Sequence, residues 1–259
     1  MNAASLRLCI IGGGNVATQL GLALSRYWDV SQVYSRTEAS AALLANRLGC
    51  PFVTDIRLLT PDADVYICAV KDSVLDVLLP LFDFRGKVLL HTAGSLPMEV
   101  LSGYADDYGV LYPLQSISKA KEMDFSKVPL LVEGSNPETL SLIRTLAESV
   151  STQVYDVTSE ARGKVHVAAV FASNFTNHMY DIASGLLEDS HLPFNVLLPL
   201  IDETAAKVHT LSPRAAQTGP AIRYDRNVID KHLNMLSDER LKKIYELLTD
   251  DIHESQMGC

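Results

Sequence analysis

The stretch at residues 6–23, LRLCIIGGGNVATQLGLA, constrains the fold of this chain more than any other. Its apolar first part runs into three consecutive glycines, and an amphipathic helical pattern begins at Asn15. A near-continuous apolar run is typical of a parallel strand that is buried on both faces. Glycine permits the backbone torsion angles of a tight turn from such a strand into a helix. The unpaired amides and the dipole at the start of that helix would bind an anion such as a pyrophosphate.

The glycines have the spacing Gly12-x-Gly14-x-x-Ala17, which is the G-x-G-x-x-G/A pattern of dinucleotide-binding turns. The candidate cofactor-binding residues of this turn are Gly12, Gly14, Asn15, Val16 and Ala17. The alternative is a glycine-rich turn without a ligand. The position of the motif, between an apolar strand and a helix, argues against that alternative.

The end of the next expected strand, at about residues 29–35, indicates which dinucleotide would bind. Folds that bind NAD place an acidic residue there, about 20 residues beyond the glycines, to hold the ribose hydroxyls. This chain instead has Ser35 followed by Arg36. A carboxylate would repel a 2′-phosphate, whereas a hydroxyl and a guanidinium can bind one. The sequence therefore predicts NADP(H) as the cofactor, and the alternative for Arg36 is a solvated surface arginine.

Strands and helices alternate through the first 157 residues, which predicts an α/β fold with a doubly wound, mostly parallel sheet. The expected strands lie at about residues 6–11, 29–35, 51–53, 64–70, 87–91, 109–112, 128–133 and 153–157, and the expected helices at about 15–27, 38–48, 73–82 and 137–150. Only helical patterns follow, at about residues 159–189, 195–211, 225–236 and 238–255. The predicted domains are residues 1–157, which bind the dinucleotide, and residues 158–259, which are all-helical.

Several polar residues stand where the expected strands end. In open α/β sheets, ligands bind beyond the carboxyl ends of the strands. The candidates from these ends are Val70, Lys71 and Thr92 for the cofactor, and His91, Ser95 and Gln115 for the substrate.

The helix expected at residues 159–189, capped by Ser159, has a polar stripe on a face that we expect to be buried. The stripe consists of His166, Ser173, Asn174, Asn177, His178 and Asp181. A buried polar group costs on the order of 1–3 kcal/mol unless it is paired, so the stripe either bonds across a helix interface or lines a wet cleft. In a cleft, a histidine can transfer a proton and Asn174 can orient a substrate oxygen. The candidate catalytic residues are therefore His166, Asn174 and His178.

The loop TGPAIRYD at residues 218–225 separates two helical patterns. Gly-Pro ends the first helix, and Asp225 is a candidate N-cap of the next. One interpretation is a capped turn with a local ion pair. The other places Arg223 in a substrate cleft, where its guanidinium would bind a carboxylate or a phosphate.

Composition argues against several classes of protein. The formal net charge is −9 and no run of basic residues is longer than two, so we expect neither nucleic acid nor a membrane surface as a partner. No apolar run approaches the roughly 20 residues of a transmembrane helix, and we expect no signal peptide. Cys9, Cys50, Cys68 and Cys259 lack the spacing of a metal site. Free thiols suit a reducing compartment, so we expect a cytoplasmic protein without a metal.

Four motifs together resemble a known family: GGGNVA at 12–17, YPLQS at 112–116, HVAAVFASNFTNHMY at 166–180 and TGPAIRYD at 218–225. They resemble bacterial proteins in which a Rossmann-like NADP-binding domain precedes a helical domain of unknown function. Those proteins are predicted NADP oxidoreductases, some of them assigned a deazaflavin coenzyme. More distantly, the chain is similar to pyrroline-5-carboxylate reductase and to the 6-phosphogluconate and 3-hydroxyisobutyrate dehydrogenases.

The resemblance implies an NADP(H)-dependent oxidoreductase that acts on a small carbonyl, hydroxy-acid or imine substrate bound between the two domains. It also implies a homodimer formed through the helical domain. Ala69-Val70-Lys71 resembles the Ala-Val-Lys strand end of pyrroline-5-carboxylate reductases. The helical lysine–asparagine pair of the hydroxyacid dehydrogenases is missing, because Ala168 stands four residues after Lys164. An NADP-binding sensor or interaction protein without catalysis is therefore the alternative function.

Overall fold

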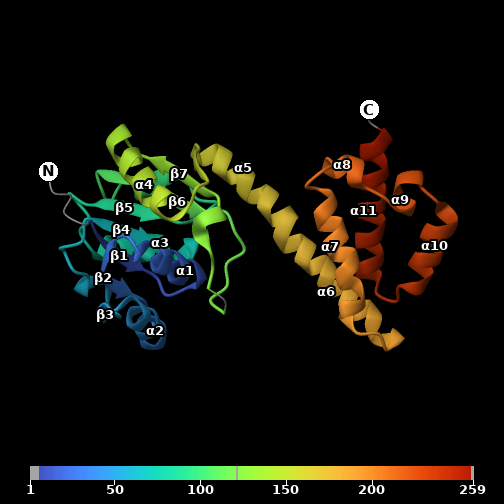
Figure 1. Ribbon diagram of the computed structural model, residues 1–259, viewed down its shortest axis with the longest axis horizontal. Coiled ribbons are helices and arrows are strands. Elements are labelled where there is room, and N and C mark those ends of the chain that lie inside the picture. The colour runs from blue at the N-terminus through green and yellow to red at the C-terminus, as the bar shows by residue number, and fades with distance from the viewer. Residues whose placement is uncertain (1–5, 121, 258–259) are drawn as a thin grey trace. The chain divides into compact units, whose positions relative to one another are not determined.

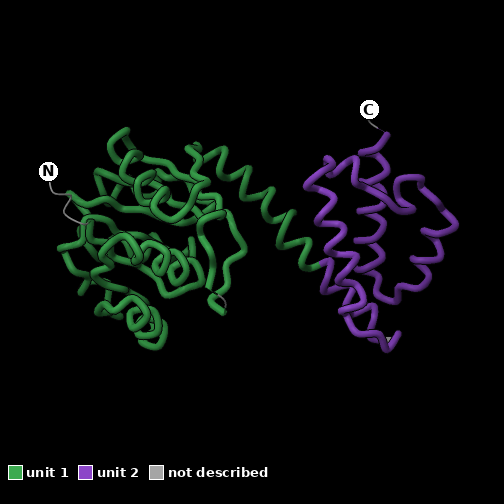
Figure 2. Tube along the Cα trace, viewed as in Figure 1, with its two compact units in different colours: residues 1–178 green, residues 179–259 purple. Residues whose placement is uncertain are grey.

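The computed structural model describes residues 6–120 and 122–257 of the chain. It divides into two compact units, residues 1–178 and 179–259 (Figures 1 and 2). The division falls inside helix α6, Thr176–Leu187. The predicted domain boundary between residues 157 and 158 lies just before helix α5, Ser159–Ala169, and it stays a prediction.

The first unit is built on an eight-stranded sheet with the order β3-β2-β1-β4-β5-β6-β7-β8 (Figure 1). The strands are β1 (Arg7–Ile11), β2 (Asp29–Tyr34), β3 (Phe52–Val53), β4 (Val65–Cys68), β5 (Val88–His91), β6 (Asp107–Pro113), β7 (Leu130–Gly134) and β8 (Val154–Asp156). All neighbouring strands pair in parallel except β6 and β7, which are antiparallel. The first six strands have the order of a Rossmann fold, whose topological switch point lies between β1 and β4. The predicted fold class is confirmed.

The helices of this unit begin and end close to the predicted positions, with one exception. The main helices are α1 (Asn15–Leu24), α2 (Glu38–Leu48) and α4 (Pro137–Val150). The single helix predicted at residues 73–82 is wrong, because α3 covers only Leu75–Leu78 between two short 3₁₀ turns. Pro80 lies in the second of these turns. Proline has no amide hydrogen to donate and cannot continue an α-helix.

Strand β1 is buried on both faces, as its sequence predicts. Leu8 and Ile10 belong to one apolar cluster, and Cys9 and Ile11 belong to another. Successive side chains of a strand point to opposite faces, so these two clusters are the two layers of core on either side of the sheet. Burial raises the thiol pKa of Cys9 far above its usual range. Cys9, Cys50 and Cys68 are free, and Cys259 lies outside the described residues.

The second unit is entirely helical. It contains most of α6, followed by α7 (Leu198–Lys207), α8 (Pro213–Ala216), α9 (Pro220–Arg223), α10 (Arg226–Met235) and α11 (Glu239–Met257). Helix α9 packs against both α10 and α11. The prediction that residues 218–225 form only a loop is wrong, because a helical turn begins at Pro220. Asp225 precedes α10 as expected, but its side chain makes no capping hydrogen bond.

The helix predicted at residues 159–189 has three parts: α5, a π-helical segment at Val170–Phe175, and α6. Its N-cap is Thr158, not Ser159, because Thr158 Oγ1 accepts a hydrogen bond from the Ala161 amide at 3.2 Å. Arg162 is the one buried residue described between positions 159 and 187. The expectation of an otherwise buried helix is therefore wrong for the single chain, because the other described side chains at residues 159–187 are half-buried or exposed.

No helix among residues 6–120 and 122–257 has the length and apolar character needed to cross a bilayer. The same residues contain no group of three or more His, Cys, Asp or Glu side chains arranged to hold a metal ion.

Candidate active site

The glycine turn lies at the switch point of the sheet, between β1 and α1. Gly12 has φ +136°, a backbone conformation that L-residues with side chains rarely adopt. A Cβ atom there would overlap the carbonyl oxygen of Ala69 at the end of β4. Gly14 is the N-cap of α1 and has no side chain to occupy the free amides. Glycine is therefore required at position 12 so that the turn packs against β4, and the start of α1 stays open to a ligand.

A cavity of about 670 Å³ extends from this turn to the ends of β2 and β4. Its lining includes Gly12, Gly13, Gly14, Ser35, Arg36, Thr37, Ser40, Val70, Lys71 and Lys119. Three of its lining residues are cationic and none is acidic, although the whole chain has a net charge of −9. Hydroxyl groups and cations around a glycine turn suit a ligand with phosphates.

A second cavity, of about 400 Å³, shares Gly14, Val70 and Lys71 with the first. Its lining adds Asn15, Val16, Asp72, Thr92, Ala93, Gly94, Ser95, Tyr112 and His166. Every predicted cofactor residue except Ala17 lines at least one of these two adjoining cavities. Ala17 is buried, and it lies 3.5 Å from where a Cβ on Gly12 would be. Its small side chain thus leaves room for the turn.

A third cavity, of about 570 Å³, shares Tyr112 and His166 with the second. Helix α5 and the π-helical segment contribute His166, Ala168, Ala169, Val170, Ala172, Ser173 and Asn174, and the chain after β6 contributes Leu114, Gln115, Ser116 and Ile117. No Asp, Glu, Lys or Arg side chain lines this cavity. Its polar groups are hydroxyls, amides and one imidazole, which can orient a neutral polar group.

Tyr112 and His166 form a hydrogen-bonded pair where the second and third cavities meet. The hydroxyl oxygen of Tyr112 lies 3.0 Å from Nδ1 of His166, and the two rings meet edge to face. Burial raises the pKa of Tyr112 above its usual value of 10. Gly94 makes the pair possible, because a Cβ there would lie 2.5 Å from His166 Nδ1 and 2.9 Å from Tyr112 Cζ.

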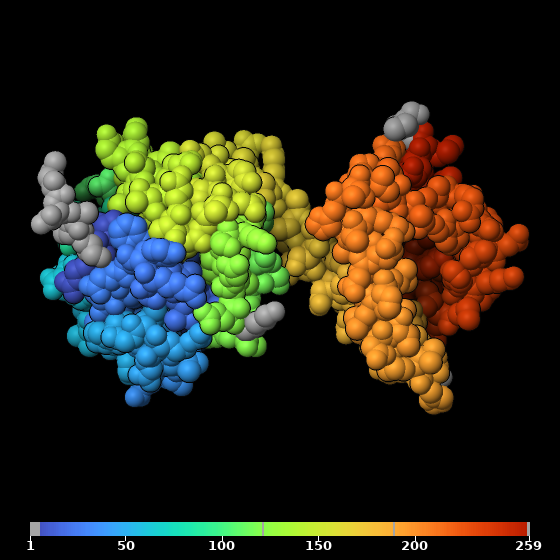
Figure 3. All heavy atoms as spheres, in the orientation of Figure 1, coloured from blue at the N-terminus to red at the C-terminus, as the bar shows by residue number. Residues whose placement is uncertain are grey.

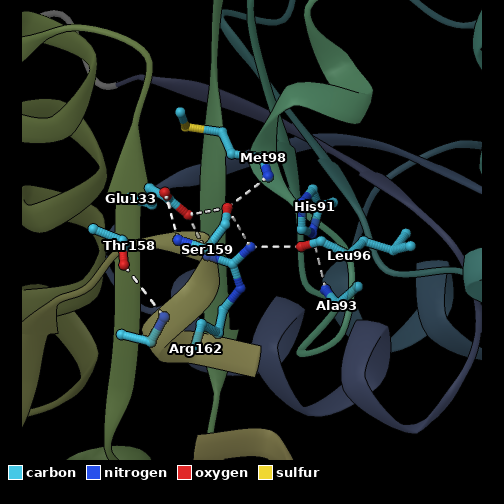
Figure 4. Close-up of polar contacts among 9 residues, drawn as sticks. His91, Ala93, Leu96, Met98, Glu133, Thr158, Ser159 and Arg162 are labelled. Carbon is cyan, nitrogen blue, oxygen red and sulfur yellow. Dashed lines mark hydrogen bonds and ion pairs between the residues drawn. The ribbon is translucent and has the colours of Figure 1, made fainter. Parts of the chain in front are cut away.

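A buried ion pair holds the start of α5 against the sheet (Figure 4). Arg162 is completely buried, and its guanidinium pairs with Glu133 on β7. The same guanidinium donates to the carbonyl oxygen of Leu96 at 2.6 Å. The hydroxyl of Ser159 donates to Glu133 at 2.8 Å. These bonds join α5 both to β7 and to the loop after β5, and His166 is one helical turn beyond Arg162.

His91 has a different environment from the other predicted site residues. It is fully buried at the end of β5, and its Nδ1 accepts a hydrogen bond from the Ala93 amide at 3.1 Å (Figure 4). Its Nε2 has no hydrogen-bond partner among the described residues. Burial, together with the positive charge of Arg162, lowers the pKa of His91 from 6.5 to about 4. His91 is therefore neutral at physiological pH and lies outside all three linings.

The remaining predicted residues separate into two groups. Gln115 and Asn174 lie with His166 in the third cavity, and Ser95 lies in the second, where its hydroxyl donates to Asp72 at 2.6 Å. His178 is exposed and outside these linings, and Arg223 is exposed in the second unit. Their predicted roles stay predictions.

Sequence reasoning did not identify Tyr112, Lys119 or Arg162 as site residues. Tyr112 had a usable signal, because it stands at the end of a strand three residues before Gln115, within the motif YPLQS. Lys119 and Arg162 had none, because their partners Gly13 and Glu133 are 106 and 29 residues away along the chain.

Comparison with known proteins identifies two family models. Residues 7–94 match the family described as NADP oxidoreductase, coenzyme F420-dependent, and residues 128–252 match a domain of unknown function, DUF2520. A comparison with curated proteins found no match.

Among solved structures, the NADP oxidoreductase-class protein BF3122 of Bacteroides fragilis is 48% identical, with a TM-score of 0.91 over 96% of this chain and 98% of that chain. A reductive aminase from Aspergillus terreus, solved with NADPH and ethyl levulinate, is 15% identical, with a TM-score of 0.75 over 98% and 96% of the two chains. A 1-pyrroline-5-carboxylate reductase from Streptococcus pyogenes is 14% identical, with a TM-score of 0.65 over 98% and 99%. The last two similarities concern the fold. The match to BF3122 over nearly the whole length, with the two family models, shows that the chain belongs to the NADP-binding family of NADP oxidoreductases that carry a DUF2520 domain.

Proposed function

We propose that this chain is an NADP(H)-dependent oxidoreductase whose small carbonyl, hydroxy-acid or imine substrate reacts beside Tyr112 and His166. One observation carries this proposal: these two residues line both the second cavity, which reaches Gly14 of the glycine turn, and the third cavity next to it. A group able to hold a proton thus lies where a cofactor and a substrate would meet.

The residues that would hold NADP(H) follow from the first two linings. The amides at the start of α1 would bind the pyrophosphate, and Ser35 with Arg36 would bind the 2′-phosphate. Lys71 and Thr92 would lie near the nicotinamide end, since they line the second cavity. The cofactor, when bound, supplies or accepts a hydride.

Arg36→Asp tests this assignment through cofactor binding alone. The substituted carboxylate should repel the 2′-phosphate, so the affinity for NADPH should fall strongly while that for NADH changes little. Fluorescence titration of both cofactors measures this. Unchanged affinity for both cofactors would show that Arg36 is only a solvated surface arginine, and equal weakening of both would show that it acts on a part that NADPH and NADH share.

The proton chemistry would belong to Tyr112 and His166. If the imidazole donates through Nδ1–H to the tyrosine oxygen, the tyrosine proton is free to point into the neutral cavity. A proton lost from Tyr112 Oη to a substrate oxygen or nitrogen can then be replaced by the Nδ1 proton of His166 across 3.0 Å, while Nε2 takes up a proton from solvent so that the imidazole ends neutral. Gln115, Ser173 and Asn174 would orient the substrate by hydrogen bonds.

The uncharged lining supports a substrate whose group in this cavity is neutral. A carboxylate placed there would lose water without gaining a cationic partner, which is costly. Ethyl levulinate, present in the Aspergillus terreus structure, is a neutral ketone and a reasonable member of a test panel. A hydroxy or keto acid would have to place its carboxylate outside this lining.

The decisive experiment measures NADPH oxidation with neutral ketones, ketones with an added amine, cyclic imines and keto acids, and NADP⁺ reduction with hydroxy acids. We expect turnover with at least one neutral ketone or imine, and slower turnover with NADH. A protein that binds NADPH but oxidises it with no panel member would instead support the sensor or interaction protein. One observation favours that alternative: Lys164 does not line the cavities but pairs with Glu160 on the exposed surface.

We also propose that two copies associate through the helical half. Val167, Phe171 and Phe175 are each between 49% and 64% exposed in the single chain, although they are large and apolar. Exposed apolar side chains clustered on one segment are typical of interfaces. Light scattering should give twice the mass of the chain, and Phe171→Glu with Phe175→Glu should convert the protein to monomers. Cytoplasmic location, and a substrate position between the two domains that includes Arg223, stay predictions.

A further inference from the structure

The chain that follows β6 is anchored to α1 and contacts the glycine turn. Gln19 of α1 is 2% exposed, and its Nε2 donates to the carbonyl oxygen of Ser118 at 2.7 Å. Gln19 Oε1 accepts from the amide of Met123 at 3.2 Å. In Figure 3, the green atoms of this segment lie against the blue atoms of the N-terminal region. Lys119 therefore extends from a backbone that α1 holds in place.

Lys119 reaches back to the turn itself. Its ammonium donates a hydrogen bond to the carbonyl oxygen of Gly13, and its side chain is half-buried. A Cβ atom on Gly13 would lie 2.9 Å from Ser35 Oγ and 3.0 Å from Ser40 Cβ. Gly13 is thus packed against the end of β2 and the first turn of α2, so the ammonium lies near the hydroxyls beside Arg36.

Lys119 lines the first of the two cofactor cavities and not the second. Asn15 and Val16, at the start of α1, line the second cavity, and Lys119 does not. Lys119 instead lines the first cavity, together with Ser35, Arg36 and Ser40. Its charge is therefore on the side of the turn that faces the end of β2. In Rossmann folds, this is where the adenosine ribose and its substituents bind.

We propose that Lys119 is a second cationic ligand of the NADP(H) 2′-phosphate and a determinant of the preference for NADP(H) over NAD(H). The proposal rests on the assignment of this cavity to the cofactor. An ammonium has three donor hydrogens, so the bond to Gly13 leaves two for phosphate oxygens. Arg36 provides the planar guanidinium, and Lys119 provides a compact charge from the chain that follows β6.

The test compares Lys119→Met with Lys127→Met, a change of an exposed lysine in the same connection that lines none of the cavities. Fluorescence titration gives the affinities for NADPH and NADH, and competition gives those for adenosine 2′,5′-bisphosphate and AMP. Lys119→Met should weaken NADPH and the bisphosphate about tenfold or more, and NADH and AMP less than about twofold. Lys127→Met should change none of them, and Lys119→Arg should keep most of the preference.

Two outcomes would overturn the proposal. Equal weakening of NADPH and NADH would show that Lys119 acts on a shared part of the cofactor or on the fold of the turn. Unchanged affinities would show that its ammonium only ties the chain to Gly13. The Arg36→Asp protein separates these failures from failure of the cavity assignment. If Arg36→Asp loses the preference for NADPH and Lys119→Met keeps it, only the role of Lys119 is contradicted. If both variants keep the preference, the assignment of this cavity to the cofactor is contradicted.

Discussion

The hydroxyl oxygen of Tyr112 lies 3.0 Å from Nδ1 of His166, although 54 residues separate the two along the chain. Tyr112 is at the end of β6, and His166 is on α5. Glycine at position 94 leaves room for this contact, and the Arg162–Glu133 pair holds α5 against the sheet. Each of these conditions can be tested separately.

Removing the Tyr112 hydroxyl should impair turnover without impairing cofactor binding. Tyr112→Phe keeps the ring but has no proton to transfer, so we expect kcat to fall about 100-fold while NADPH affinity stays within about twofold. Tyr108→Phe is the matched control, because Tyr108 is on the same strand and outside the three linings. Because burial raises the Tyr112 pKa above 10, reduction by the wild type should decline only at still higher pH. Unchanged kcat in Tyr112→Phe would exclude this hydroxyl as proton donor.

Adding one methyl group at position 94 should separate the pair. In Gly94→Ala, the new Cβ would lie 2.5 Å from His166 Nδ1, so the neighbours must move, at a cost of about 1–3 kcal/mol in unfolding free energy. Gly103→Ala is the control, because a Cβ there meets nothing within 4 Å. His166→Ala should recover much of the lost stability in the Gly94→Ala background, since it makes room for the methyl group. Additive effects of the two changes would argue against the clash.

Breaking the buried ion pair should destabilise the first unit. Glu133→Gln leaves the fully buried guanidinium of Arg162 without its counter-charge, and we expect a loss of about 3–5 kcal/mol. Trp28, the single tryptophan of the chain, lies in this unit and donates to Ser149 Oγ, so its fluorescence during urea unfolding measures the effect. Asp83→Asn, which breaks the exposed Arg85–Asp83 pair, should change stability little. A small effect of Glu133→Gln would mean that water or rearrangement compensates the charge.

His91 should make the first unit sensitive to acid. Its pKa is about 4 in the folded protein and 6.5 when unperturbed, so between these values the unfolded chain binds a proton that the folded chain does not. Stability should therefore fall as the pH drops from 6.5 to 4, by up to about 3 kcal/mol from this residue. The Trp28 signal should show a shallower pH dependence in His91→Gln than in the wild type. His209→Gln, a change at an exposed histidine, should leave that dependence unaltered.

The parts of the site that were predictable depend on short spacings. The glycine turn, the first turn of α1 and the pair Ser35-Arg36 are each recognisable within a few residues, because strand burial and turn geometry are set locally. The predicted α/β fold was correct for the same reason. The prediction of one continuous helix at residues 73–82 was wrong. Pro80 cannot donate a helical hydrogen bond, so it interrupts the helix that the apolar pattern predicts.

The sequence by itself determined the Rossmann topology, the phosphate-binding turn and the chemical character of the strand ends, because these follow from periodicity and from residues adjacent in the chain. Only the tertiary structure decided which side chains meet in the cavities. Tyr112 reaches His166, and Lys119 reaches Gly13, across 54 and 106 residues. Such contacts depend on how β6 and the chain after it pass over α1, and on how a buried ion pair positions α5. These are properties of packing that leave no pattern in local sequence.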